Sequence, residues 1–519
     1  MKRISAVLVL SSGLLAACGG KKEAGGAGAG TGSATGSATG AGSGAGSGSA
    51  TGSGSAAGAG SGGTGAGSGS AALATDAGGH TGAARWATSL GGGGSDYLRA
   101  VALAPDGGAA VAGYFEQPFT AGALGEKSSA GDADAVVVRL GPDGAPRWVQ
   151  TLGAKRADVG NGVAVGADGA VLLVGNFLDD VTVGDLVGKA AGSDDLFALA
   201  LDPDGTPRWL ATAGGHDSDG GNAVAATPDG GWVMVGSFSG GAEVLGQHFT
   251  VVGGTDAWMI KLAKDGQLVW AKAFGGDAAD TFNYVTVDQA GNILVAGTFS
   301  GKATFGGAEL ASAGGADTDV VVAKYDPTGA HLWSQRFGNQ FNDAPGGVAV
   351  DPAGHVAVTG AFQQSIVFGE GEYKSKGEAD VFLVRLDPAG KLLWSRTFGS
   401  DRGDVGMGVG ADAAGNVVVT GWFQGAADFG GGALRNLNGN QDVFVAKYDP
   451  TGKVLWAQRV GDKDHDQGRA LAVGADGAIT LAGVYHFDLA LAGVTTLVSV
   501  RKPDDRAPPI DMFVARLAR

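Results

Sequence analysis

A tryptophan recurs seven times at nearly constant spacing, and this spacing limits the fold more than any other feature of the sequence. Successive copies lie 61 to 63 residues apart. The copies are Trp86, Trp148, Trp209, Trp270, Trp333, Trp394 and Trp456. A repeat of this length is typical of arrays in which each unit is one supersecondary structure that must stack on its neighbours.

Other residues keep a fixed distance from each tryptophan. A glycine lies four residues before it and another five residues after it, as Gly82 and Gly91 do around Trp86. An aromatic residue lies 29 residues after it, from Phe115 to Tyr485. An aspartate lies ten residues after it, at Asp96, Asp158, Asp219, Asp280, Asp343, Asp404 and Asp466. We interpret these positions as parts of a repeated scaffold.

Each unit reads as four short strands, because β-rich runs such as "VLWAQRV" and "DVFVAKYD" are bounded by Gly, Pro and Asp. The segments "DPTG" at 449–452 and "DAAG" at 412–415 fit tight turns between antiparallel strands. The sequence therefore predicts an all-β chain, a seven-bladed β-propeller over 80–519. The first tryptophan strand and the C-terminal strand lack partners within their units, so we expect their pairing to close the ring.

The recurring tryptophans are expected to pack between blades, while a role in sugar binding stays open. Trp258 and Trp422 do not recur and are better ligand candidates. The aspartate ten residues after each tryptophan lies in the predicted crossover between blades. A second aspartate precedes each fourth strand, at Asp134, Asp195, Asp256, Asp319, Asp380, Asp442 and Asp511. The carboxylates either capture cations or accept backbone N–H groups and brace the loops; we favour bracing because it recurs in every unit.

The pattern "DVFVAKYDPTGKVLWAQRVG…ALAVGADG" resembles the bacterial β-propeller repeat called SBBP, which occurs in envelope and cell-surface proteins. The resemblance covers all seven units and implies a seven-bladed propeller at the cell envelope with no established activity. The last unit departs from it through the insertion "RKPDDRAPPI" at 501–510. The repeat is more loosely similar to that of pyrroloquinoline-quinone enzymes. The chain lacks the quinone-specific residues of those enzymes, and its number of units differs from theirs.

The N-terminus is predicted to be a lipoprotein signal peptide, residues 1–17. Lys2 and Arg3 precede a short apolar run that ends in "LAAC", which resembles the bacterial lipobox. Cys18, the only cysteine, would then carry the lipid. An ordinary secretory signal is the alternative. Residues 18–79, rich in Gly, Ala, Ser and Thr, are expected to form a disordered tether. Gly19 after the cysteine resembles an outer-membrane sorting signal.

The formal net charge of −16 argues against nucleic acid as a partner. Binding sites concentrate on variable loops held by a rigid scaffold, so we expect them on the face that carries the crossovers. The candidates are residues that break the repeat: His216, Asp217, Trp258, Arg402, Trp422, Asp462, Asp464, His465, Arg501 and Lys502.

No catalytic motif of the metalloprotease, serine-hydrolase or P-loop kind occurs in the repeat region. Asp462 and Asp464 resemble the start of a calcium loop, but its glycine and distal glutamate are missing. We therefore expect no cofactor, with calcium as the open alternative.

The sequence is best explained by a monomeric binding or scaffolding module, held at the outer membrane by its N-terminal lipid, for a protein or glycan ligand. The propeller could face the periplasm or the cell surface. An outer-membrane assembly lipoprotein of the BamB type and a propeller enzyme such as a lyase or glycosidase remain alternatives, because the fold alone does not decide function.

Overall fold

The computed structural model describes residues 82–436, 438–499 and 509–519. The predicted signal peptide 1–17, Cys18 and the tether 18–79 lie outside these residues, as do Arg501 and Lys502. The described residues form β-strands and one short 3-10 helix, Gly122–Leu124, so the chain has an all-β, propeller-type fold. None of their helices has the length and hydropathy that crossing a membrane requires.

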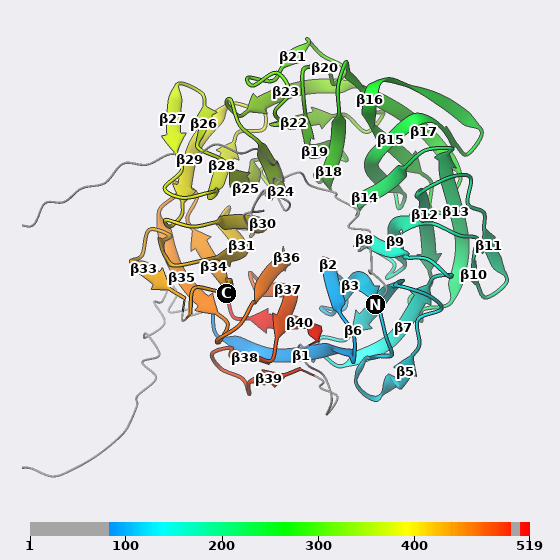
Figure 1. Ribbon diagram of the computed structural model, residues 1–519, viewed down its shortest axis with the longest axis horizontal. Coiled ribbons are helices and arrows are strands. Elements are labelled where there is room, and N and C mark those ends of the chain that lie inside the picture. The colour runs from blue at the N-terminus through cyan, green and yellow to red at the C-terminus, as the bar shows by residue number, and fades with distance from the viewer. Residues whose placement is uncertain (1–81, 437, 500–508) are drawn as a thin grey trace, which may run out of the picture. The chain divides into compact units, whose positions relative to one another are not determined.

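Four sheets contain four antiparallel strands each, and the strands follow one another in chain order apart from a short inserted hairpin (Figure 1). They are β2 (Asp96–Leu103), β3 (Ala109–Phe115), β6 (Asp134–Leu140) and β7 (Pro146–Leu152); β18 (Asp280–Val287), β19 (Ile293–Phe299), β22 (Asp319–Tyr325) and β23 (His331–Phe337); β24 (Asp343–Val350), β25 (Val356–Phe362), β28 (Asp380–Leu386) and β29 (Leu392–Phe398); and β30 (Asp404–Ala411), β31 (Val417–Phe423), β34 (Asp442–Tyr448) and β35 (Val454–Val460). Each set begins with a strand rich in small residues, here called the small-residue strand, which starts at the aspartate ten residues after one tryptophan. Each set ends with the strand that carries the next tryptophan.

Two further sets of four are joined into one larger sheet, which the sequence did not predict. They are β8 (Val159–Val165), β9 (Val171–Phe177), β12 (Asp195–Leu201) and β13 (Pro207–Gly215), and β14 (Asp219–Ala226), β15 (Trp232–Val244), β16 (Gln247–Leu262) and β17 (Leu268–Gly276). β15 and β16 are 13 and 16 residues long, and the extra length of β15 pairs with the end of β13. This edge pairing joins the two sets of four strands into one hydrogen-bonded sheet, while their middle strands still pack against each other in one buried cluster.

The first and last strands of the described chain lie side by side. β1 (Ala84–Gly92) pairs antiparallel with β40 (Ile510–Leu517), which also pairs with β37 (Ile479–His486); β36 (Gln467–Val473) completes the set. Trp86 lies opposite Arg516 and Leu90 opposite Met512. Just before β1, the Gly82 carbonyl accepts a hydrogen bond of 3.0 Å from the Gln458 side chain.

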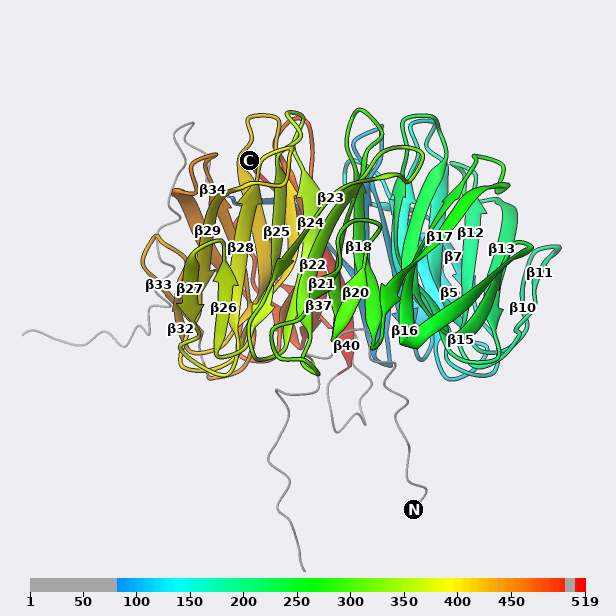
Figure 2. The same cartoon turned by 90° about the horizontal axis from the view of Figure 1, so that it is seen from above.

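The small-residue strands form the inner row of the sheets, as Figure 1 shows. β2, β8, β14, β18, β24, β30 and β36 each contact the next strand in this order, and β36 contacts β2. Strands run between two opposite faces, where the turns and crossovers lie (Figure 2). Small residues suit this inner position because their backbones approach closely: a methyl group at Gly346 would lie 1.9 Å from the Gly406 carbonyl oxygen.

The segments before the fourth strands were expected to be variable loops on one face, but most form short hairpins at the outer rim (Figure 1). The hairpin strands are β4 (Phe119–Thr120) and β5 (Glu126–Lys127); β10 (Val181–Val183) and β11 (Leu186–Gly188); β20 (Lys302–Thr304) and β21 (Leu310–Ala311); β26 (Ser365–Phe368) and β27 (Gly371–Lys374); β32 (Ala426–Asp428) and β33 (Ala433–Arg435); and β38 (Asp488–Leu489) and β39 (Leu497–Val498). β4 pairs with β1, and β20 with β17. The hairpins thus cover part of the outer edge strands, whose backbone groups need partners.

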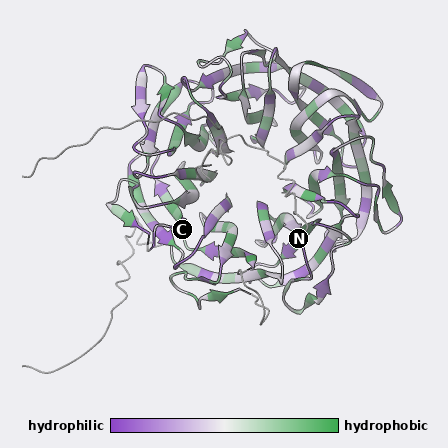
Figure 3. Ribbon diagram, viewed as in Figure 1, coloured by the Kyte–Doolittle hydropathy of each residue, from purple (hydrophilic) through white to green (hydrophobic). Residues whose placement is uncertain are grey.

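The hydrophobic core lies between adjacent sheets, where the middle strands of one sheet pack on those of the next. Val235 of β15, for example, belongs to the same buried cluster as Val295 of β19 and Val321 of β22. Hydrophobic and hydrophilic segments alternate in every sector of the fold (Figure 3). Because each sheet is covered on both sides, the middle strands read as nearly continuous apolar runs such as "VVVTGWF".

Candidate functional site

The glycine five residues after each tryptophan lies against the aspartate that begins the preceding fourth strand. In three units a methyl group at this glycine would also lie within 3 Å of the aspartate ten residues after the tryptophan. A methyl group at Gly275 would lie 2.4 Å from Asp256 Oδ1 and 2.9 Å from Asp280 Oδ2. Gly275 follows Trp270 by five residues and Asp280 follows it by ten. Only glycine therefore leaves room for the two carboxylates, which explains why the three positions recur together.

The aspartate ten residues after each tryptophan braces its own crossover. It accepts a hydrogen bond of 2.6 to 3.1 Å from the backbone N–H four residues earlier in all seven units. Asp158 and Asp404 also accept from the N–H twenty residues later, at 3.1 and 3.0 Å. The bracing interpretation is therefore supported by the bonds themselves. Within the described residues, no group of three acidic, histidine or cysteine side chains is placed to hold a metal ion.

Burial raises the pKa of these carboxyl groups far above the usual value. The pKa rises to about 8 for Asp96, Asp343 and Asp466 and to about 7 for Asp158, Asp219, Asp280 and Asp404. Desolvation is the main cause, and the charge of the second aspartate, which lies on the neighbouring sheet, raises the pKa further, while backbone N–H donors oppose both. Each pair therefore retains protons close to neutral pH.

The recurring tryptophans link neighbouring sheets. Six donate their indole N–H to a backbone carbonyl in the turn that precedes the tryptophan strand of the next unit, as Trp86 does to Pro142 at 2.9 Å. The ring also covers the turn glycine, since a methyl group at Gly144 would lie 2.5 Å from the Trp86 ring. These six are half-buried, whereas Trp456, which covers Gly82, is 2% exposed.

Trp258 and Trp422, named from the sequence as ligand candidates, prove to be wrong choices. They are 3% and 1% exposed. Both lie on middle strands, β16 and β31, which adjacent sheets cover on both sides. Trp258 lines only a narrow internal pocket, and neither ring is exposed enough to form a surface ligand site.

The remaining candidates lie on three separate crossovers. His216 and Asp217 are exposed in the β13–β14 connection, and Arg402 is exposed in the β29–β30 connection. Arg402 donates to the Gly439 carbonyl at 3.2 Å. Within the described residues, no hydrogen bond or ion pair joins these three side chains to one another.

The third crossover, between β35 and β36, holds the remaining three candidates: Asp462, Asp464 and His465. His486 Nδ1 lies 2.7 Å from the His465 carbonyl oxygen, and the two imidazole rings lie 5.9 Å apart. The backbone N–H of Asp462 donates to Asp466, so this residue also serves the bracing of the crossover.

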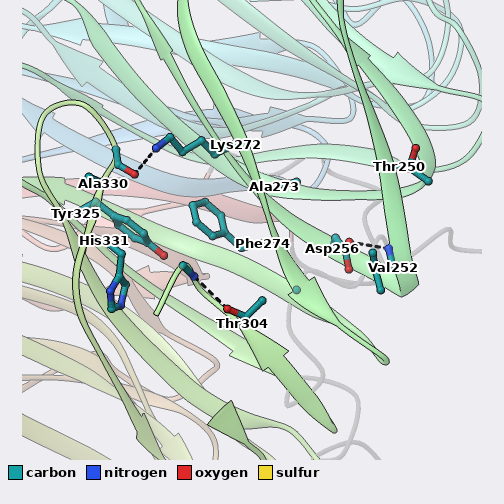
Figure 4. A pocket seen from close by; sticks show the side chains of 13 residues that line it. Thr250, Val252, Asp256, Lys272, Ala273, Phe274, Thr304, Tyr325, Ala330 and His331 are labelled. Atoms are coloured by element: carbon teal, nitrogen blue, oxygen red, sulfur yellow. Dashed lines mark hydrogen bonds between the residues drawn. The ribbon is translucent and has the colours of Figure 1, made fainter. Parts of the chain in front are cut away.

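A groove of about 660 Å³ opens between β16–β17 and β22–β23 (Figure 4). On one wall, Lys272 donates to the Gly329 carbonyl at 2.6 Å; on the other lies His331, whose pKa burial lowers. The Tyr325 hydroxyl donates to the Phe305 carbonyl at 2.8 Å, and Phe274 lies against it with ring centres 5.2 Å apart. The groove thus combines aromatic walls with a neutral histidine and one fixed cation.

A second cavity is lined by all seven inner strands and carries residues that sequence reasoning missed. Arg99 from β2, Tyr284 from β18 and Arg469 from β36 lie on its wall. A signal was present in the sequence: Arg99 and Arg469 occupy a position where the other units have Asn, Gly or Met, and Tyr284 occupies one where the others have Ala or Gly.

Comparisons with known proteins support a repeat fold without showing a family. No family model matches the chain. An uncharacterized WD repeat-containing protein of Acanthamoeba polyphaga mimivirus is 26% identical over 43% of this chain and 19% of its own length. The regulatory protein FlaEY of Caulobacter vibrioides is 31% identical over 22% of this chain and 12% of its own length. The chain thus spans less than a fifth of these curated relatives.

Among solved structures, the WD40 domain of Neurospora crassa Pan2 aligns with 81% of this chain, and the alignment covers 89% of that domain. The sequence identity is 9% and the TM-score is 0.41. A likeness at this level supports no transfer of function. The SBBP resemblance therefore remains a hypothesis from the repeat, and function must be argued from the surface of this chain.

Proposed function

We propose that the chain is a protein-binding scaffold whose outer rim docks an envelope protein. In this proposal the sheets form a seven-bladed propeller, closed where β1 pairs with β40. The support is the pairing itself, the seven copies of the repeat, and the contact of each inner strand with the next.

One observation carries the protein-binding role. The residue before each recurring tryptophan is exposed on the outer strand in six of the seven units. On three successive outer strands it is aliphatic, at Val269, Leu332 and Leu393, with exposed fractions of 53%, 50% and 48%. In three other units the same position is Arg85, Arg147 or Arg208. One side of the rim is thus apolar and the other basic.

The apolar side of the rim also carries the groove of Figure 4, because His331 of the groove directly precedes Leu332. Exposed aliphatic side chains beside a groove with aromatic walls offer both the apolar contact and the pocket that interface anchors use. An apolar rim fits a protein better than a glycan, since glycan recognition needs dense polar contacts.

Crosslinking in intact cells tests this role. A photoreactive amino acid at Leu332 should capture one specific envelope protein, whereas the same group at Val187, which is 55% exposed on the β11 hairpin, should not. The triple variant Val269→Glu, Leu332→Glu, Leu393→Glu should lower capture at a groove position such as Thr250 at least tenfold. Equal capture at Leu332 and Val187, or none at either, would contradict the protein partner; none at either would direct attention to glycans.

A second arm compares full-length protein with a version lacking Lys502–Pro509. Because the proposed contact is the rim of β17, β23 and β29, capture through Leu332 should be retained. Loss of capture in this deletion would move the contact to the last unit.

The lipid anchor is proposed from the lipobox resemblance alone. Cys18→Ser should remove acyl incorporation and transfer the protein from the membrane fraction to the soluble fraction. Retention of the variant in the membrane fraction would indicate an ordinary signal peptide and attachment to the membrane by another means.

A further inference from the structure

Each inner strand contains a β-bulge at the same position of the repeat. The register shifts between Leu98 and Ala100 in β2, and between Gly468 and Ala470 in β36. Equivalent shifts occur in the other five inner strands. A bulge re-aims the extra residue, and such positions are common beside functional sites. The bulged residues are Arg99, Asn161, Asn222, Asn283, Gly346, Met407 and Arg469.

The backbone repeats at the bulge but the side chain does not. Six of the seven bulged residues line the cavity, which has a volume of about 160 Å³. Two of them, Arg99 and Arg469, are arginines on adjacent inner strands. None of the described residues that line the cavity is Asp or Glu. Two cations therefore share a small space that supplies no carboxylate, within a chain whose net charge is −16.

Both guanidinium groups are held against aromatic rings. Arg99 lies over Tyr114 at 5.5 Å and Arg469 over Tyr97 at 5.8 Å, and the two tyrosine rings stack at 5.1 Å. This arrangement fixes the orientation of the arginines through cation–π contact. Glu116, whose charge acts on both tyrosines, is not among the residues lining the cavity.

Arg469 has unused capacity for hydrogen bonding. Its buried Nε atom has no partner among the described residues. Desolvation lowers the pKa of Arg469, and the charge of Arg99 lowers it further. An unsatisfied buried donor and a like-charged neighbour both cost free energy, and an anion placed between the arginines would relieve both.

The opposite wall provides a third polar group. At the position after the bulge, Tyr284 is the single large residue, because the other six inner strands have Ala or Gly there. Its phenol is close enough for both arginine charges to act on its pKa, although burial raises that pKa overall. The hydroxyl therefore stays protonated and available as a donor.

We propose that this cavity binds a small oxyanion, a carboxylate or a phosphate, between Arg99, Arg469 and Tyr284. The planar guanidinium fork matches the two oxygens of either group and binds them in bidentate fashion. The volume is close to that of an engineered cavity of about 150 Å³ that holds benzene, so the ligand has few heavy atoms. This site is independent of the rim proposed above to dock a protein.

Calorimetric titration of the whole protein at constant ionic strength tests the site. The probes are inorganic phosphate and succinate, with chloride as the reference anion. One of the two should bind saturably at one site and more tightly than chloride, which also identifies the phosphate or carboxylate source. Arg469→Gln and Arg99→Gln should each weaken binding at least tenfold, and Tyr284→Phe about two- to tenfold, the range for one hydrogen bond.

Arg156→Gln is the matched control, because Arg156 is an exposed arginine on the β7–β8 crossover, outside the cavity. Its affinity should equal that of the unaltered protein. Equal affinity in Arg469→Gln and Arg156→Gln would overturn the proposal, as would the absence of saturable binding by both probes.

A further variant keeps both arginines, so that a loss of binding through blocked anion access can be distinguished from a loss of binding through misfolding. Met407 lines the cavity from β30, the strand next to β36. Met407→Glu should place a carboxylate near Arg469, raise the melting temperature and abolish binding of the probe. Unchanged probe binding in this variant would also overturn the proposal.

Discussion

The carboxylate pairs and the inner-strand bulges are both repeated seven times, yet they differ in a way that separates scaffold from site. At the carboxylate pairs both the backbone and the side chains recur, and each pair closes its own crossover. At the bulges the backbone recurs while the side chain changes from Arg to Asn, Gly or Met. A position with constant geometry and variable chemistry is the place to look for a ligand. The predictions below test this contrast.

The largest loss of stability is expected for Trp456, which is 2% exposed and covers Gly82. Trp456→Ala should destabilise the protein by about 3–5 kcal/mol, the range for removal of a buried tryptophan. Trp333→Ala should cost less, because Trp333 is half-buried. Urea denaturation of both variants measures the difference. Equal losses would mean that the contact of Trp456 with Gly82 contributes nothing special.

The glycine beside each carboxylate pair should tolerate no side chain. Gly275→Ala places a methyl group 2.4 Å from Asp256 Oδ1 and should cost about 1–3 kcal/mol, as overpacking does. Gly431→Ala is the control, since no atom lies within 4 Å of the added methyl group. It should change stability by less than about 0.5 kcal/mol. Similar values for the two variants in urea denaturation would remove the steric explanation for the recurring glycine–aspartate register.

The buried pairs should give the protein an unusual dependence on pH. In each pair the aspartate ten residues after the tryptophan has a folded-state pKa of about 7 to 8, which exceeds the unfolded value of 3.8, so the folded state binds more protons between these values. The stabilising contribution is complete below pH 3.8 and is lost as pH rises through 7 to 8. The melting temperature should therefore fall between pH 5 and pH 8.

Asp280→Asn imitates the protonated group, so it should raise the melting temperature at pH 8 and change it little at pH 5. Asp326→Asn is the opposite control, because hydrogen bonds from the Thr328 hydroxyl and nearby backbone lower the pKa of Asp326 on the surface. The Asp326 carboxylate stabilises the folded protein above its unfolded pKa, and this contribution is lost as pH falls through the folded pKa. A melting temperature that does not change from pH 5 to pH 8 would mean that the pairs carry a counterion other than a proton.

The smallest effect is expected from calcium. The described residues bring no third acidic ligand to Asp462 and Asp464, so millimolar calcium or EDTA should shift the melting temperature by less than the pH change does. A clear rise with calcium that Asp464→Ala removes would instead establish a site in the β35–β36 crossover.

Much of the scaffold could be predicted from the sequence because its causes are local. The "DPTG" turn ends at Gly452, whose φ of 80° suits glycine, and Asp449 accepts from the backbone of Thr451 and Lys453 within the same turn. The strands "VLWAQRV" and "DVFVAKY" lie where the pattern predicted them. Contacts that repeat in every unit need no long-range information, since one unit and its period describe them all.

The site could not be predicted, because burial and convergence depend on distant parts of the chain. Trp258 and Trp422 looked available from the sequence, yet neighbouring sheets cover them. Arg99 and Arg469 are separated by most of the chain and meet only because β36 contacts β2. By itself the sequence determined the repeat, the turns and the glycine–aspartate register, since these follow from local sterics and hydrogen bonding. Tertiary structure alone decided which non-repeating side chains share a cavity, because packing sets that proximity.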